Sequence, residues 1–451
     1  MNRLYSLIFI ALISGGCAAP MPSDSAITDA WPADVRIEFS DNPARRGDPV
    51  HVRVLGLTPG AEVRVRAERL SLWQPTSLYR TEARFVADSS GQIDLATDVP
   101  IAGRWASADP NALFWTMRTV EEDLPEGLTA EEVSVEVFGL GDELITRAVL
   151  TYASALVELI ESPLGAEFPG AFLLRRPGSE PRPVIVVLGG SEGNDGAARN
   201  EAPLWAERGY AAVGLPYYSP TWGKQPQAIP GLPRGFANIP LDTLIGVRDA
   251  LRLRSDVDSD RIGLLGISKG AEFVLAGASR IDGFAAVAAI VPSDVIWEGW
   301  GAGSSPGRTP SFSWRGEPLD FVPYVGIERA IGQVPQDERV AMRVPHAEGR
   351  ARHPGRAAAA RIRVEDIDEP VFVLGGGQDQ VWDSGEMAAR IAAVRADAGL
   401  ETDVLIFAEA GHGISGPPQT PTRHSSINAR SVGWVALQAF FERTLKGEIQ
   451  D

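Results

Sequence analysis

The 451-residue sequence contains one cysteine, only five histidines and no excess of positive charge. Its formal net charge is −17, and an acidic surface repels phosphate backbones, which argues against nucleic-acid binding. There is no G-x-G-x-x-G sequence after an expected strand, no Walker loop and no H-E-x-x-H motif, so we predict no cofactor and no metal site. The length and the 44% of hydrophobic residues instead predict a globular protein of two or three domains.

The single cysteine, Cys17, follows a short apolar segment at the N-terminus. Arg3 precedes this segment, Leu4 to Ser14 is too short for a stable membrane span, and small residues stand directly before Cys17. The pattern resembles the lipobox of bacterial lipoproteins, whose cysteine is lipidated. We predict a lipoprotein signal peptide over residues 1–16, a linker over 17–34, and an exported protein anchored to a membrane through Cys17 and facing the periplasm. An ordinary secretory signal and a cytoplasmic protein with a chance apolar start are the alternatives.

Two parts of the remaining chain follow different hydrophobic patterns. Residues 35–152 contain short alternating runs separated by turn residues and no long helical pattern, which predicts an all-β sandwich. Residues 153–451 alternate near-continuous apolar runs with amphipathic ones, which predicts an α/β domain with a doubly wound, mostly parallel sheet. Residues 293–366 fit this alternation worst and are expected to form an insertion or lid over the sheet. Helices are expected at 201–210, 241–255, 270–280, 384–399 and 431–445.

Three serines stand at the centre of a G-x-S-x-G sequence: Ser191, Ser268 and Ser305. In a nucleophile elbow a strand leads directly into this sequence and a helix leads directly out. Only Ser268 has both neighbours, in "IGLLG" and "AEFVLAGAS", so we predict that it is a catalytic nucleophile. Ser305 lies in a Gly/Ser/Pro segment and reads as a loop serine.

Ser191 follows an expected strand but precedes a glycine-rich loop. In a hydrolase of this layout, such a loop supplies one backbone N–H group of the oxyanion hole, and the residue after the nucleophile supplies another. We therefore predict that backbone N–H groups of Lys269, Gly190 and Ser191 stabilise the oxyanion. The charged side chain of Lys269 is expected at the surface, at the start of the helix.

A serine nucleophile requires a base, and the base requires an orienting acid. His412 follows a strand in the glycine-flanked loop "AGHGI", late in the chain, where the base of such a hydrolase belongs. Asp379, after the strand "VFVLGGGQ", is the predicted acid because it lies between Ser268 and His412 in the chain. Asp383 is the alternative acid. The other histidines lie in the β part, in the insertion and in a polar loop: His51, His346, His353 and His424.

Aromatic residues are frequent in the expected insertion. They could line a pocket for an acyl chain, or they could only pack the insertion onto the sheet. The six residues concerned are Trp297, Trp300, Phe312, Trp314, Phe321 and Tyr324.

The sequence resembles the acyl-CoA thioesterase / bile acid-CoA:amino acid N-acyltransferase family over roughly residues 35–445. The motifs are "GLLGISKGAE" around Ser268, "GGGQD" ending at Asp379, "AGHGI" around His412, and "RVLGLTPGAEVRVRA" and "LFWTM" in the N-terminal part. The resemblance implies an Ig-like sandwich followed by an α/β-hydrolase domain, with these three residues as the triad. It also implies hydrolysis of acyl-CoA to a free fatty acid and coenzyme A. Members that conjugate amino acids use a cysteine nucleophile, so Ser268 favours water as the acyl acceptor.

Two features depart from the family. Members often carry an acidic residue and a histidine just after the triad aspartate, whereas Asp379 is followed here by Gln380, Val381 and Trp382. An exported enzyme would also meet little coenzyme A. The alternatives are therefore an exported esterase or lactonase with other acyl substrates, an acyltransferase to an amine, and a non-enzymatic surface-binding lipoprotein. The sequence predicts no oligomeric state.

Overall fold

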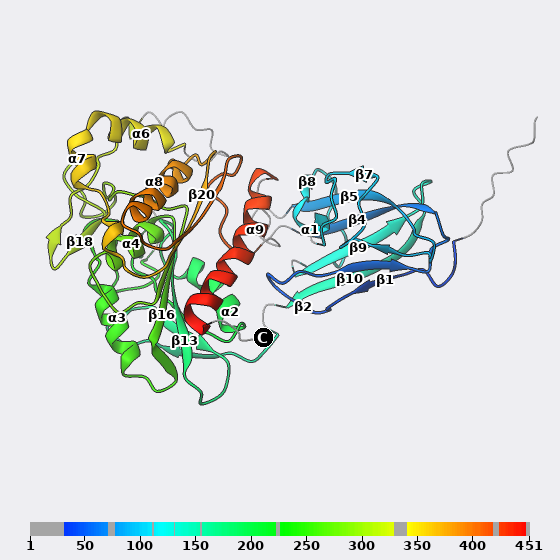
Figure 1. Cartoon of the computed structure of the whole chain (residues 1–451), viewed down its shortest axis with the longest axis horizontal. Helices are drawn as coiled ribbons and strands as arrows, with labels where there is room; N and C mark the ends of the chain where they lie inside the picture. The colour runs from blue at the N-terminus through cyan, green and yellow to red at the C-terminus, as the bar shows by residue number, and fades with distance from the viewer. Residues whose placement is uncertain are drawn as a thin grey trace, which may run out of the picture.

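The computed structural model describes residues 31–70, 77–110, 112–129, 131–153, 156–221, 226–328, 341–417 and 424–447. The predicted signal peptide, Cys17 and most of the predicted linker lie outside these residues. A β-rich N-terminal domain lies beside an α/β domain, and the long helix α9 (His424–Phe441) lies on the side of the α/β domain that faces the β domain (Figure 1). None of the helices in these ranges is both long and apolar enough to cross a membrane.

The N-terminal domain consists of two β-sheets that share one apolar core. One sheet has the order β1-β3-β6, and the other has the order β2-β10-β9-β4-β5-β7 with β8 also paired to β5. Val52 and Val54 from the first sheet and Val65 from the second are fully buried in the same cluster. The one-turn helix α1 (Ala112–Trp115) was not expected from the sequence pattern. The strands are β1 (Arg36–Phe39), β2 (Ala44–Arg45), β3 (Val52–Leu55), β4 (Glu62–Leu70), β5 (Leu78–Val86), β6 (Ile93–Asp94), β7 (Ala102–Gly103), β8 (Arg118–Val120), β9 (Glu132–Phe138) and β10 (Leu144–Ala153).

The larger sheet of this domain carries alternating charges across four of its strands. Arg147, Glu136, Arg66 and Glu82 are register partners on β10, β9, β4 and β5 in turn. Arg147 Nε donates to Glu136 Oε1 at 2.7 Å, and Arg66 Nε lies 3.2 Å from Glu82 Oε2. Opposite charges on neighbouring strands stabilise the pairing. The alternation of these residues with buried valines explains the period-two pattern of the sequence.

The α/β domain is built on one eight-stranded sheet with the order β11-β12-β14-β13-β16-β17-β20-β21. The six strands from β14 to β21 are parallel, and β11 and β12 add an antiparallel edge. The predicted mostly parallel sheet is therefore confirmed. The strands are β11 (Ile160–Pro163), β12 (Phe172–Arg175), β13 (Arg182–Leu188), β14 (Ala211–Gly214), β16 (Val257–Ile267), β17 (Ala286–Ile290), β20 (Val371–Gly376) and β21 (Thr402–Phe407).

Helices cover both faces of this sheet, as the alternating pattern predicts. α3 (Thr243–Arg252), α4 (Lys269–Ala278) and α8 (Ser384–Asp397) contribute to the core on one face. α2 (Gly196–Ala206) and α9 pack on the other face. α9 begins at His424, earlier than expected, so His424 belongs to a helix and not to a polar loop.

Residues 293–328, the described first part of the expected insertion, contain little regular structure. β18 (Phe312–Trp314) pairs with β19 (Glu317–Pro318) and with β15 (Ile239–Pro240) in a small separate sheet. α6 (Arg343–Arg352), α7 (Pro354–Ala359) and the 3-10 turn η1 (Val364–Asp366) follow. α6 and α7 lie at one end of the α/β domain, near α8 (Figure 1).

α9 also connects the two domains. Trp434 Nε1 donates to the carbonyl of Gly47 at 3.0 Å, and Arg208 forms an ion pair with Asp48. Gly47 has φ +92°, and a Cβ atom there would lie 2.5 Å from Trp434 Nε1. Only glycine fits both the backbone conformation and this contact.

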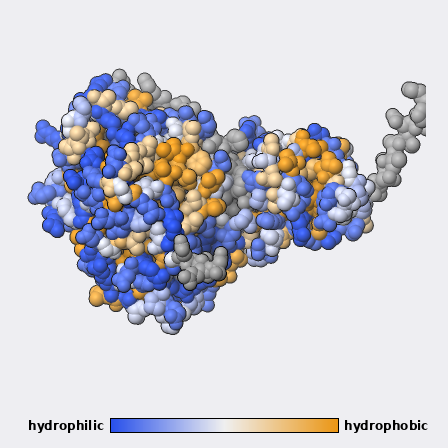
Figure 2. All heavy atoms as spheres, in the orientation of Figure 1, coloured by the Kyte–Doolittle hydropathy of each residue, from blue (hydrophilic) through white to orange (hydrophobic). Residues whose placement is uncertain are grey.

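Hydrophilic residues cover most of the molecular face in Figure 2, where apolar residues gather mainly in one area on each domain. Exposed apolar side chains of the α/β domain include Val404 and Ile406 on the edge strand β21 and Val432 and Val435 on α9. These two elements contact each other, so one part of the exposed apolar surface lies around β21 and α9.

Candidate active site

Ser268 lies between the end of β16 and the start of α4. Its backbone has φ +57° and ψ −117°, and its N–H donates to the carbonyl of Ile290 at 2.9 Å. A non-glycine residue pays for a positive φ with backbone strain, which is the hallmark of a nucleophile elbow. Two residues on, a Cβ atom at Gly270 would lie 2.3 Å from the carbonyl oxygen of Gly189. The glycine therefore allows α4 to pass close to the end of β13.

His412 lies five residues after the end of β21, in a loop held by α9. Ser426 Oγ accepts a hydrogen bond from the Gly411 N–H at 3.1 Å, and Arg430 Nε donates to the Gly413 carbonyl at 2.9 Å. His412 Nε2 lies 2.9 Å from Ser268 Oγ. The helix that follows the loop thus fixes the backbone on both sides of the histidine.

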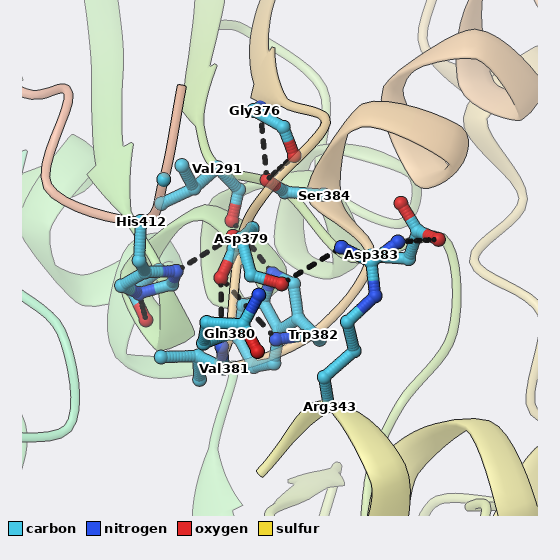
Figure 3. A network of polar contacts seen from close by, with 12 residues as sticks. Val291, Arg343, Gly376, Asp379, Gln380, Val381, Trp382, Asp383, Ser384 and His412 are labelled. Atoms are coloured by element: carbon cyan, nitrogen blue, oxygen red, sulfur yellow. Dashed lines mark hydrogen bonds and ion pairs between the residues drawn. The ribbon is translucent and has the colours of Figure 1, made fainter. Parts of the chain in front are cut away.

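Asp379 lies in the loop after β20, and its carboxylate accepts hydrogen bonds on both oxygens (Figure 3). Oδ2 lies 2.8 Å from His412 Nδ1, while Oδ1 accepts from the N–H groups of Val381 at 2.8 Å and Trp382 at 3.4 Å. The side chain is fully buried. Because a carboxylate only accepts, His412 Nδ1 carries a proton and its Nε2 is free to accept the proton of Ser268.

Asp383, the alternative acid, has a different set of partners. Its carboxylate pairs with Arg343 at 2.5 Å and accepts from the Glu386 N–H at 3.3 Å, which caps α8. Arg343 also donates to the carbonyls of Gly377 and Asp379, both at 2.9 Å. Asp383 therefore holds the loop that carries Asp379, and it does not face His412 (Figure 3).

Two of the three predicted oxyanion residues, Lys269 and Gly190, lie close to Ser268. The N–H of Lys269 is at the first turn of α4, where helix N–H groups have no acceptor within the helix. A Cβ atom at Gly190 would lie 3.1 Å from Ser268 Cβ, so this loop does reach the nucleophile. The Gly190 N–H donates to Glu192 Oε1 at 2.9 Å, so it would have to leave this partner to serve as the predicted oxyanion donor. Ser191, an exposed residue, remains the candidate donor of this loop.

The hydrogen bonds that join Ser268, His412 and Asp379 do not include Ser305, His51 or His353. The Ser305 N–H donates to Thr309 Oγ1 within a loop of the insertion. His51 is exposed in the β domain, His353 lies between α6 and α7, and His424 starts α9. The described residues contain no group of three or more His, Cys, Asp or Glu side chains able to hold a metal ion.

The side chain of Lys269 is buried, so the expectation of a surface residue is wrong. Its exposed fraction is 2%, and Nζ lies 2.6 Å from Glu272 Oε2, whose side chain is fully buried. The reason is the spacing: residues three apart lie on the same side of a helix, and Glu272 neutralises the ammonium there. This signal was present in the sequence, but the general rule for charged residues pointed to the surface.

A second buried histidine, His346 on α6, lies in a group of aromatic rings next to the triad. Its ring contacts Trp297 at 4.5 Å, Tyr324 at 4.9 Å and Trp382 at 5.4 Å between centroids. Trp382 in turn contacts His412 at 5.7 Å. Burial lowers the pKa of His346 to about 3, so the ring is neutral. No sequence motif marks this contact between the insertion and His412, the predicted base.

The aromatic residues of the insertion mostly contact each other and the rest of the protein. Trp300 stacks on Phe236 with centroids 4.4 Å apart, and Phe312 packs edge-on against Phe236 and Phe273. The Phe321 ring lies under Arg356. These contacts favour the packing interpretation for these side chains.

The parallel sheet, the elbow and the Ser268–His412–Asp379 arrangement define an enzyme of the hydrolase class with an α/β fold. Residues 47–141 match the family region described as "Acyl-CoA thioester hydrolase/BAAT N-terminal region", and residues 249–436 match "BAAT / Acyl-CoA thioester hydrolase C terminal". The chain belongs to this family, as its motifs predicted.

Characterised relatives extend over both domains. Rat mitochondrial acyl-coenzyme A thioesterase 2 is 27% identical over 433 residues, covering 89% of this chain and 87% of the relative. Human acyl-coenzyme A thioesterase 1 is 26% identical over 431 residues, covering 89% and 94%. Among solved structures, Pyrococcus horikoshii acylaminoacyl peptidase matches 93% of this chain and 58% of its own, with 16% identity and a TM-score of 0.43. A likeness at that level does not inform on function.

Proposed function

We propose that the protein is a serine hydrolase that cleaves acyl thioesters, converting acyl-CoA to a free fatty acid and coenzyme A. The observation that carries the proposal is a continuous set of hydrogen bonds. Ser268 Oγ lies 2.9 Å from His412 Nε2, and His412 Nδ1 lies 2.8 Å from Asp379 Oδ2. The names of the relatives, which are acyl-CoA thioesterases, support the thioester as substrate.

In the first half of the proposed reaction, Ser268 Oγ attacks the thioester carbonyl carbon as His412 Nε2 takes its proton. Asp379 holds the imidazole in the required tautomer and stabilises its protonated form. The N–H groups of Lys269 and Ser191 donate to the negatively charged oxygen that develops, each such donor being worth about 3 kcal/mol of transition-state stabilisation. The C–S bond then breaks, the thiol leaves with the proton from His412, and the acyl group remains on Ser268.

In the second half, water replaces the thiol. His412 Nε2 removes a proton from water, and the resulting oxygen nucleophile attacks the acyl-enzyme ester. The tetrahedral intermediate uses the same N–H donors. Its collapse returns the proton from His412 to Ser268 Oγ and releases the free acid.

The test uses acyl-CoA thioesters and p-nitrophenyl esters over several chain lengths. We expect turnover of acyl-CoA by the wild type and loss of at least about 10³-fold in kcat for Ser268→Ala. A fluorophosphonate probe should label the wild type at Ser268 and leave the variant unlabelled. Full turnover by Ser268→Ala would refute the nucleophile. Turnover of oxygen esters alone would refute the thioester substrate while retaining the hydrolase.

One sequence observation favours a second candidate, an exported esterase or lactonase that acts on acyl substrates other than coenzyme A esters. Cys17 and the apolar segment before it match the lipobox pattern, and we propose that Cys17 is lipidated and anchors the enzyme at a membrane facing the periplasm. Labelled palmitate should enter the wild type and not Cys17→Ser, and the variant should leave the membrane fraction. Unchanged labelling and fractionation of Cys17→Ser would overturn this localisation.

Acyl transfer to an amine uses the same residues and differs only in the second acceptor. Added amino acid should not divert product from the free acid if water is the acceptor, as Ser268 suggests. Conjugated product that grows with amino acid concentration would identify the acyltransferase instead.

A further inference from the structure

Next to the nucleophile, the first turn of α4 contains an ion pair that the proposed chemistry does not use. Lys269 Nζ and Glu272 Oε2 lie 2.6 Å apart, and both side chains are almost completely buried. Burial lowers the pKa of Lys269 and raises the pKa of Glu272, since both charges are removed from water. Such a pair is a weak source of stability, because desolvation cancels much of its attraction. The position of the pair beside Ser268 therefore indicates a role other than stability.

The ammonium group of Lys269 is fixed from the side of the insertion. Nζ donates to Ser311 Oγ at 2.8 Å, and Ser311 Oγ donates to the carbonyl of Glu298 at 3.1 Å. Three aromatic rings surround the same nitrogen, with their centroids 5.0–5.6 Å away, a distance at which cation–π attraction operates. These rings belong to Phe236, Trp300 and Phe312.

The carboxylate of Glu272 is fixed to the same segment through its other oxygen. Oε1 accepts a hydrogen bond from the Trp297 N–H at 3.0 Å. The Trp297 ring contacts His346, which contacts Trp382, which contacts His412. The segment that the ion pair holds at the elbow therefore also reaches the base on the opposite side of the site.

We propose that Lys269 and Glu272 are positioning residues of this active site. They lock the segment 297–311 of the insertion against the nucleophile elbow, and so hold the first turn of α4, with the Lys269 N–H, in the orientation that the oxyanion requires. The inference rests on the proposed hydrolase function, because it assigns the pair a part in transition-state stabilisation. It predicts that loss of the pair lowers kcat and leaves KM nearly unchanged.

The main test is the double variant Lys269→Met/Glu272→Leu, which removes both charges at similar volume and leaves no unpaired buried charge. We expect a melting temperature equal to or above that of the wild type, a fall in kcat of about 10–100-fold and a KM within about threefold of wild type. Lys269→Met/Glu272→Gln restores an acceptor for the Trp297 N–H and should recover part of kcat. A role confined to stability predicts unchanged kcat in both variants and no such recovery.

Ser311→Ala removes only the link from the ammonium to the insertion, so it tests the proposal even if the double variant does not fold. We expect a smaller loss of kcat, about three- to tenfold, with KM unchanged. The matched control is Asp256→Asn, which breaks the 2.8 Å ion pair with Arg175 at the other end of β16 and should retain wild-type kcat. Wild-type kcat in Ser311→Ala and in every folded variant of the pair would overturn the proposal.

Failure of this inference and failure of the proposed function give different results. A wild type that reacts with fluorophosphonate at Ser268 but does not cleave acyl-CoA contradicts the thioester substrate only. The rate of fluorophosphonate labelling then replaces kcat as the readout, because the probe also places a negatively polarised oxygen at the N–H donors. The pair variants should label more slowly than both the wild type and Asp256→Asn, and equal labelling rates would overturn the positioning role.

Discussion

Two buried carboxylates of the β domain and the enclosed ion pairs of the α/β domain differ in how far their partners reach water. In the β domain, the buried carboxylates Glu68 and Glu136 pair with Arg80 and Arg147, whose side chains are 17% and 58% exposed. In the α/β domain, both members of the Lys269–Glu272 pair are enclosed, and Asp379 is fully buried against a largely buried His412.

The two arrangements differ in how much hydration the charges lose and in how well each tolerates substitution. A charge whose partner reaches water keeps part of its hydration. The partly exposed ion pairs of the β domain therefore cost little desolvation free energy, and their loss changes stability little. Enclosed charges lose that hydration and require every hydrogen bond that surrounds them. We therefore expect substitutions of the enclosed charges of the α/β domain to have large effects, and substitutions of the partly exposed charges on the β-domain sheet to have small ones.

The largest expected effect is on activity, at the buried acid. Asp379→Asn removes the acceptor-only partner of His412 Nδ1 and allows the wrong imidazole tautomer, so we expect kcat to fall by about 10⁴-fold. Steady-state kinetics on the preferred acyl substrate measures this. Asp383→Asn, four residues away, weakens only the ion pair with Arg343 and should cost less than about tenfold. The reverse ranking would show that Asp383 is the acid.

The next effect is on stability, at a buried arginine of the α/β domain. Arg395 is fully buried, and its guanidinium donates to the carbonyls of Val364, Ile367, Glu369 and Glu401. Arg395→Met leaves these acceptors without their donor, and we expect a loss of at least about 3 kcal/mol in the free energy of unfolding. Urea denaturation measures it. A loss below about 1 kcal/mol would contradict the importance assigned to enclosed charge.

A smaller effect, dependent on pH, is expected at His346. Burial holds its pKa at about 3, whereas the unfolded chain has a value near 6.5, so the unfolded state binds the extra proton as the pH falls. The stability associated with the neutral ring is therefore complete above pH 6.5 and is lost as the pH falls toward 3, by about 2 kcal/mol at pH 5. His346→Gln should lose less stability than the wild type between pH 7.5 and 5. The exposed His51 in the β domain is the control, and His51→Gln should follow the wild-type profile.

The smallest effect is expected on the charged face of the β domain. Arg84 pairs with Glu62 at 2.8 Å, and its side chain is 48% exposed. Arg84→Met, the same substitution as at Arg395, should change the free energy of unfolding by less than about 1 kcal/mol. A loss as large as that of Arg395→Met would remove the distinction between the two domains.

Much of the fold could be predicted because burial leaves a periodic signature. The apolar run in β16 and the helical pattern after Ser268 place the elbow, and chain order on a parallel sheet places Asp379 and His412 at the same edge. Their hydrogen-bonded arrangement agrees with that placement, while their catalytic roles stay predictions until activity is measured. The sequence supplied no comparable signal for the 293–366 segment, because its contacts are long-range and its strands are two or three residues long.

Two differences between expectation and structure at the site involve a neighbouring carboxylate. Lys269 was expected in solvent, and Gly190 was expected to offer a free N–H. Each prediction considered one residue without the carboxylate nearby, Glu272 in one case and Glu192 in the other. The spacing of Lys269 and Glu272 on an expected helix was visible in the sequence, whereas the contact of Glu192 with Gly190 depends on how a loop turns, which composition and periodicity do not specify.

Helix α9 has a consequence for dividing the protein into parts. Its first turns hold the loop of His412 through Ser426 and Arg430, and one turn further on Trp434 is bonded to Gly47 of the β domain. The same helix thus supports the loop of His412, the predicted base, and contacts the other domain. A cut between the domains would remove the acceptor of the Trp434 indole N–H and the contact of that ring with Gly47. The N-terminal domain therefore helps to support the loop of His412 through α9. We expect an isolated α/β domain to be less active than the whole chain.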